Sequence, residues 1–326
     1  MANGLYKNCP QDEEHALFAL PDFIGTMMEN NWLGSKTGQG FYKKIKKEDG
    51  SSEILSLDLQ SMDYRPRQKA AFATLELTKS VDNVIDRFPI LVNGKDKAAE
   101  FYRKNFGAMF AYVSHRIPEI ADEVYKIDDA MKAGFGWEHG PFQIWDAIGL
   151  QKGIDLATEA GKTVATWVTD MVEAGHDSFY TVKEGATYCF FPQTKQQARI
   201  PGQDAFIILD NIRQSKAVFQ NSGVVVHDLG DGILNVEFRS KMNSIGGDVL
   251  AGLNKAIDLA ETSYDGLVVG NQGANFSVGA NIGMIFMMAV EQEYDELNMA
   301  IKYFQDTVMR LRYSSIPTVV APHGMT

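Results

Sequence analysis

The spacing of apolar residues changes once along this 326-residue chain, near Pro201. Between about residues 66 and 175 the apolar side chains recur every three or four positions, for example at 98, 99, 102, 106, 109, 110 and 113, which predicts helices. After residue 201, short apolar runs alternate with one-sided helical stretches, which is typical of α/β folds. We therefore predict a multidomain chain that is mainly α over residues 1–205 and α/β over residues 206–326.

Individual elements can be predicted from local patterns. Residues 41–46 and 53–58 flank Asp49-Gly50, which favours a β-hairpin. In the second part, strands are expected at 205–209, 224–227, 233–238, 266–270 and 317–321, and helices at 245–261 and 293–312. A weak internal repeat relates residues 27–41 to residues 171–188, and it indicates a duplicated helical module.

Composition excludes several functions. The chain carries 31 Lys+Arg against 42 Asp+Glu, so its net charge of −11 disfavours nucleic-acid binding. Its two cysteines, Cys9 and Cys189, suit a reducing compartment, and the first residues lack the apolar core of a signal peptide. The longest nearly uncharged apolar stretch, residues 278–290, is too short to span a bilayer. We expect a cytoplasmic protein without a transmembrane segment or a metal site.

Two glycine-containing motifs lie in the helical part. By their residues alone, Gly34–Tyr42 reads as a turn into the hairpin, and in Gly134–Leu150 the aromatic residues suit a core and His139 a structural role. Together they resemble the C-terminal helical domain of the 3-hydroxyacyl-CoA dehydrogenase family. The first motif matches that family from Leu33 to Tyr42. The second matches it at Gly134, Phe135, Gly136, Gly140, Pro141, Phe142, Asp146, Gly149 and Leu150.

A third motif occupies residues 270–282, where a strand runs through glycines into a helix. An ordinary loop would look the same, but free backbone N–H groups beside a helix N-terminus also suit a carbonyl oxygen that becomes negative. The stretch resembles the Phe-Ser-x-Gly-Ala-Asp segment of the crotonase superfamily, and residues 317–324 resemble the strand before that family's second oxyanion donor. The resemblance implies that the N–H of Ala280 is an oxyanion-hole donor, with Gly279 and Asn281 beside it. It also implies that Lys241 and Asn243 lie near coenzyme A, although their spacing is one residue shorter than in the family.

Both resemblances imply a bifunctional β-oxidation enzyme acting on acyl-CoA thioesters, of which this chain is an internal fragment. The NAD-binding domain with its His/Glu pair would precede residue 1, and the Gly-Gly-Gly-x-Glu segment would follow Thr326. We therefore expect no NAD or other cofactor on this chain and no catalysis by it alone. We also expect either homo-oligomerisation that covers its exposed apolar surface or partial disorder after about residue 206.

Two alternatives to this reading remain. A non-catalytic acyl-CoA-binding or assembly module stays open. A stand-alone NAD dehydrogenase is disfavoured, because no Gly-x-Gly-x-x-Gly follows a strand in this sequence.

Overall fold

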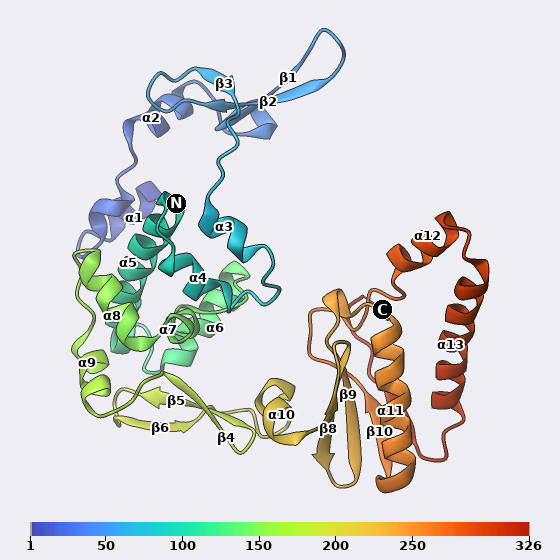
Figure 1. The fold of residues 1–326 in the computed structure, drawn as a ribbon. Coiled ribbons are helices and arrows are strands. Elements are labelled where there is room, and N and C mark those ends of the chain that lie inside the picture. Colours follow the sequence, from blue (N-terminus) through green and yellow to red (C-terminus); the bar gives the residue numbers. More distant parts are fainter. Residues whose placement is uncertain (1, 326) are drawn as a thin grey trace. The chain divides into compact units, whose positions relative to one another are not determined.

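The computed structural model describes residues 2–325, which divide after Ala71 into two units (Figure 1). The first unit begins with α1 (Ala2–Asn8), a 3₁₀ turn (His15–Phe18), α2 (Asp22–Glu29) and a second 3₁₀ turn (Ser35–Thr37). A three-stranded antiparallel sheet follows, with β1 (Tyr42–Lys46), β2 (Ser52–Leu57) and β3 (Tyr64–Pro66) in that order. The predicted hairpin is confirmed, and Gly50 adopts a φ of 81° in its turn, which glycine accommodates without a steric cost.

The second unit begins with a helical part. It contains α3 (Ala73–Thr78), α4 (Arg87–Asn93), α5 (Lys97–Glu119), α6 (Val124–Phe135), α7 (Pro141–Ile148), α8 (Leu150–Glu159) and α9 (Thr166–Glu173). A three-stranded antiparallel sheet closes it, formed by β4 (Tyr180–Lys183), β5 (Ala186–Phe191) and β6 (Gln196–Arg199). In both halves of the predicted repeat, a helix of eight residues (α2, α9) therefore precedes a three-stranded antiparallel sheet.

Trp145 lies at the centre of the helical core. Its ring is fully buried and stacks on Phe110 at a centroid distance of 4.7 Å, while Phe179 meets it edge-on at 5.0 Å. The indole N–H donates to the carbonyl of Leu150 at 2.9 Å, so the one polar group of the side chain is satisfied. Gly153 lies against the indole, and a Cβ at this position would overlap it. The aromatic residues of the 134–150 motif therefore serve packing.

Two buried aspartates hold the elements around α7 together. Asp128 accepts hydrogen bonds from the N–H groups of Phe142 (2.8 Å) and Gln143 (3.1 Å) at the start of α7. Asp146 accepts from the N–H groups of Phe179 and Tyr180, both at 2.8 Å, and so ties α7 to β4. Burial raises the pKa of Asp128 to about 6 and that of Asp146 to about 7, because desolvation outweighs these hydrogen bonds.

A five-stranded sheet organises the rest of the unit, in the order β11-β10-β9-β8-β7. Its strands are β7 (Ala217–Gln220), β8 (Val224–Gly230), β9 (Ile233–Phe238), β10 (Gly266–Val269) and β11 (Thr318–Val320). β10 runs parallel to β9 and β11, whereas β7, β8 and β9 are antiparallel. The amphipathic helix α11 (Gly247–Ser263) packs on β8, β9 and β10. The strands predicted at 224–227, 233–238, 266–270 and 317–321 are confirmed.

Two further helices complete this part, α12 (Ile282–Val290) and α13 (Tyr294–Arg312). Arg310 of α13 donates to Asp258 and Asn254 of α11, both at 2.7 Å, which joins the two helices. No residue of α12 is buried, and several of its apolar side chains, such as Ile282 (74% exposed) and Phe286 (64% exposed), face solvent.

The strand predicted at residues 205–209 is wrong. This stretch is a turn that enters α10 (Leu209–Lys216), because the side-chain amide of Gln272 takes the place of a strand partner. It donates to the carbonyl of Ile207 at 2.7 Å and accepts from the N–H of Leu209 at 2.8 Å. α10 is then fastened to the sheet by Arg213, which pairs with the buried Glu237 of β9 at 2.8 Å. The predicted domain boundary at 205/206 stays a prediction.

Two helical glycines allow a matched test of this packing. We expect Gly153→Ala to destabilise the protein by about 1–3 kcal/mol, since the new methyl group overlaps Trp145. Gly134→Ala, in the exposed end of α6, meets no atom within 4 Å and should stabilise the helix by about 0.5 kcal/mol. Urea unfolding followed by tryptophan fluorescence measures both. A smaller loss of unfolding free energy in Gly153→Ala than in Gly134→Ala would contradict the described packing around Trp145.

The buried aspartates also predict how stability depends on pH. A carboxyl whose pKa is higher in the folded than in the unfolded state stabilises the fold at low pH, and this stability is lost as pH rises through the folded pKa. For Asp128 and Asp146 the window runs from about pH 4 to pH 7. Burial lowers the pKa of His139, which opposes the trend, but this side chain is only partly buried.

We therefore expect the free energy of unfolding to fall by about 3 kcal/mol between pH 5 and pH 7.5. Asp146→Asn, which removes one titrating group, should flatten the profile. Urea titrations at half-unit pH intervals provide the measurement, and stability that rises across the window would be inconsistent with these pKa values.

Candidate functional site

The loop between β10 and α12 has the architecture that the sequence predicts. β10 ends at Val269, the loop covers residues 270–281, and α12 begins at Ile282. The side chain of Asn281 accepts a hydrogen bond from the N–H of Met284 at 3.3 Å and so caps α12. Asn281 was predicted to bind substrate, and the structure shows it at a helix N-terminus with its side chain engaged in capping.

The backbone of Ala280 forms an isolated parallel bridge with Ile245. Ile245 donates its N–H to the carbonyl of Gly279 at 2.8 Å, and its carbonyl accepts from the N–H of Asn281 at 3.3 Å. Since backbone groups alternate in direction along an extended chain, the N–H of Ala280 points away from Ile245. Within residues 2–325 this N–H has no hydrogen-bond partner. It is therefore available to an external acceptor.

Gly279 precedes this N–H with a φ of 84°, a conformation that glycine adopts readily and that side chains with a Cβ avoid. Its own N–H donates to Oγ of Ser277 at 2.9 Å. Ser277 is buried, and its hydroxyl donates to the carbonyl of Asn243 at 2.7 Å. These bonds connect the loop to the turn that precedes α11.

Asn243 lies in that turn, a 3₁₀ segment over Lys241–Asn243. Its Nδ2 donates to the carbonyl of Asn275 at 2.9 Å and to Oδ1 of Asn271 at 3.2 Å. The side chain that was predicted to lie near coenzyme A is thus an anchor of the loop. Lys241, in the same turn, is exposed and forms no ion pair in the described part of the chain. The structure therefore brings Lys241, Asn243 and residues 279–281 into one region.

The segment after β11 also contacts this loop. The N–H of Phe276 donates to the carbonyl of His323 at 2.9 Å, and the N–H of Met325 donates to Oδ1 of Asn275 at 2.8 Å. Nε2 of His323 lies 2.8 Å from the carbonyl of Gly273. The 270–282 motif and the segment that resembles the strand before the second oxyanion donor are accordingly neighbours in space.

An apolar cavity of about 300 Å³ adjoins Ala280, and sequence reasoning missed it. Ile245 and Ala280 line one side of it, and the remaining walls come from three helices. The apolar side chains from α11, α12 and α13 are Leu250, Met284, Ile285, Leu297, Ile301 and Phe304. The helical periodicity of these residues was visible in the sequence, but the shared space between the helices was not.

Other kinds of site find no support among residues 2–325. No three or more His, Cys, Asp or Glu side chains are placed there to hold a metal ion. No helix in that range is long and apolar enough to cross a membrane.

Comparisons with known proteins agree with part of the sequence analysis. Residues 106–188 match the model of the 3-hydroxyacyl-CoA dehydrogenase C-terminal domain. The whole chain is 37% identical to a probable 3-hydroxyacyl-CoA dehydrogenase of Bacillus subtilis, of which it covers 40%. Over 96% of its length it is 23% identical to a putative fatty acid oxidation complex trifunctional enzyme of Rickettsia prowazekii, covering 39% of that protein. The chain thus spans about two fifths of the length of the curated relatives it matches.

Solved structures with some similarity include an enoyl-CoA hydratase/isomerase from Xanthobacter autotrophicus Py2. It is 23% identical, with a TM-score of 0.28, over 32% of this chain and 40% of that one. An enoyl-CoA hydratase from Bacillus halodurans is 20% identical, with a TM-score of 0.30, over 32% of this chain and 43% of that one.

The predicted dehydrogenase resemblance is confirmed over residues 106–188, which include the 134–150 motif. The motif from Leu33 to Tyr42 lies outside the matched residues, and the roles of Ala280, Lys241, Asn243, Gly279 and Asn281 stay predictions.

Ser277 offers a test of how the loop is held. We expect Ser277→Ala to speed hydrogen exchange of the Gly279 amide by roughly tenfold, since the variant removes its acceptor and the link to Asn243. Ser263→Ala, at the exposed end of α11, serves as the control and should leave the loop unchanged. Equal exchange in both variants would show that Ser277 does not order the loop.

Proposed function

We propose that this chain contributes an acyl-CoA thioester site to a fatty-acid β-oxidation enzyme that combines 3-hydroxyacyl-CoA dehydrogenase and enoyl-CoA hydratase activities. The dehydrogenase part of the proposal is supported by the family match over residues 106–188 and by the relatives' descriptions. The hydratase part is supported by the 270–282 motif and by the geometry of its loop. NAD would be bound by the whole enzyme, and we place that enzyme in the cytoplasm.

The observation that carries the proposal is the unpaired N–H of Ala280 next to an apolar cavity. The oxygen of a thioester carbonyl gains negative charge when the thioester becomes an enolate. A fixed N–H donor stabilises this charged oxygen more than it stabilises the neutral carbonyl of the ground state. The hydrogen bonds of Ile245 fix the direction of the donor before substrate binds. The cavity lined by Leu250, Ile301 and Phe304 would hold the acyl chain.

The proposal also covers the domains of the chain, its contact with coenzyme A and its assembly. We assign residues 1–205 to dehydrogenase-type helical domains and residues 206–326 to part of a crotonase-like domain. Lys241, exposed in the turn that anchors the loop, would meet the anionic coenzyme A moiety. The exposed apolar side chains of α12 support homo-oligomerisation or coverage by further residues of the enzyme. We propose that residues 1–326 alone bind acyl-CoA but catalyse neither step.

Binding calorimetry with octanoyl-CoA, acetyl-CoA and free coenzyme A tests the site in this chain. We expect octanoyl-CoA to bind at least about tenfold more tightly than acetyl-CoA. Its longer acyl chain buries more methylene groups in the cavity, and each buried methylene contributes about 0.8 kcal/mol. Ile301→Asp, in the wall of the cavity, should abolish that preference. Ile282→Asp, which is exposed on α12 outside the cavity, should retain it.

The outcomes separate the candidate functions. Equal affinity for the three ligands would refute an acyl site, and no binding of any of them would favour an assembly module. Hydration of crotonyl-CoA or NADH-dependent reduction of acetoacetyl-CoA by residues 1–326 would refute the proposed lack of catalysis.

A further inference from the structure

The first half of the 270–281 loop is held by the side chain of Gln272. Its Nε2 donates to the carbonyl of Ile207 at 2.7 Å, and its Oε1 accepts from the N–H of Leu209 at 2.8 Å. Ile208, between these two groups, has an extended backbone (φ −98°, ψ 108°), and an extended residue offers the same pair of groups to a neighbouring strand. The amide therefore fixes the loop to the segment before α10 in one register. Gln272 itself is exposed, so it acts through these two hydrogen bonds and not through burial in the core.

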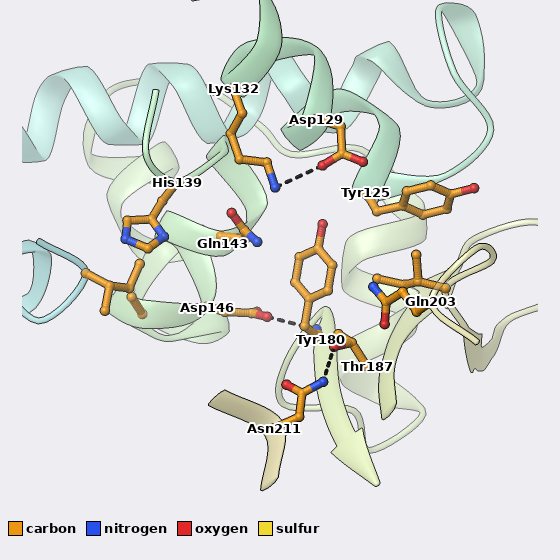
Figure 2. A pocket seen from close by; sticks show the side chains of 13 residues that line it. Tyr125, Asp129, Lys132, His139, Gln143, Asp146, Tyr180, Thr187, Gln203 and Asn211 are labelled. Carbon is orange, nitrogen blue, oxygen red and sulfur yellow. Dashed lines mark hydrogen bonds and ion pairs between the residues drawn. The ribbon is translucent and has the colours of Figure 1, made fainter. Parts of the chain in front are cut away.

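α10 is fastened to two sheets. Arg213 pairs with the buried Glu237 of β9 at 2.8 Å, which holds the helix on the five-stranded sheet. Nδ2 of Asn211 donates to Oγ1 of Thr187 in β5 at 2.8 Å (Figure 2), and it also donates to the carbonyl of Gly185 at 3.2 Å. α10 therefore connects the five-stranded sheet with the three-stranded sheet that closes the helical part.

A series of hydrogen bonds continues from Gln272 along the loop. The neighbouring Asn271 accepts from Nδ2 of Asn243 at 3.2 Å. The carbonyl of Asn243 accepts from the hydroxyl of Ser277 at 2.7 Å, and Oγ of Ser277 accepts from the N–H of Gly279 at 2.9 Å. The candidate oxyanion donor follows Gly279 directly, so its direction depends on both ends of the loop.

We infer that Gln272 is a positioning residue for the candidate thioester site, an inference that rests on the proposed function. Together with α10, it makes the order of the 270–281 loop depend on the helical part of the chain. An N–H donor stabilises a developing charge effectively when its direction is fixed beforehand. Loss of the amide of Gln272 should therefore loosen the donor at Ala280. The apolar cavity should stay in place, because Gln272 does not line it.

Hydrogen exchange of the ligand-free 326-residue chain tests the inference without any substrate. Gln272→Met keeps the length of the side chain and removes both of its hydrogen bonds. The Gly279 amide should then exchange roughly fivefold faster than in the parent. Gln214→Met, on the exposed surface of α10, is the matched control and should exchange as the parent does. Equal exchange in the two variants would overturn the inference.

Two threonines of the three-stranded sheet test the contribution of the helical part. Thr187→Val removes an acceptor of Asn211 and should speed exchange of the Gly279 amide about twofold. Thr181→Val removes a hydrogen bond within the same sheet, to Gln197 at 2.6 Å, and should leave that exchange unchanged. An effect of Thr181→Val as large as that of Thr187→Val would contradict the dependence on α10.

Octanoyl-CoA relates the loop to the site. In Gln272→Met its affinity should fall roughly fivefold, and it should shift the Ala280 amide proton less than in the parent, as measured with ¹⁵N-labelled alanine. Free coenzyme A, which has no thioester oxygen, should bind both chains equally. An unchanged affinity and shift in Gln272→Met would overturn the inference. A parent chain that binds no octanoyl-CoA would instead refute the proposed function, and the exchange of Gly279 would still decide the role of Gln272.

Discussion

The two hydrogen bonds that Ile245 makes to Gly279 and Asn281 determine the geometry of the candidate thioester site. They use the backbone groups on either side of Ala280 and leave the N–H of Ala280 directed the other way. The side chains of Ser277 and Asn243 then hold the loop in this register. A donor fixed in this manner needs little rearrangement when charge develops on a bound oxygen, which is the condition for effective electrostatic stabilisation.

The helical part is held by aromatic packing and by two buried carboxyl groups. Packing around Trp145 requires α7 and β4 to meet closely, and Asp128 and Asp146 satisfy the backbone N–H groups that this arrangement buries. The desolvation of these two carboxyl groups opposes their ionisation. The contacts that order the 134–150 motif therefore also make its stability depend on pH. His139 and Gln203, by contrast, each keep one buried polar atom, Nε2 and Oε1, without a hydrogen-bond partner in the described part of the chain.

Much of the fold could be predicted from sequence because its elements carry local signals. The Asp49-Gly50 turn, the apolar runs of β8 to β11 and the periodicity of α11 and α13 all act over a few residues. The segment 205–209 could not be predicted, because the side chain of Gln272, more than sixty residues away, decides its conformation. The apolar cavity beside Ala280 was missed for the same reason, because its walls come from segments far apart in the sequence. Motifs located the Ala280 loop, but the roles of Asn243 and Asn281 within it depend on contacts across the fold.

We propose that the N–H of Ala280 receives a thioester oxygen. Selective ¹⁵N labelling of alanine, followed by proton–nitrogen spectra during addition of octanoyl-CoA, would observe this group directly. We expect a downfield shift of the Ala280 amide proton with octanoyl-CoA and little change with free coenzyme A. A bound acyl-CoA that shifts other amides and leaves Ala280 unaffected would contradict this proposal.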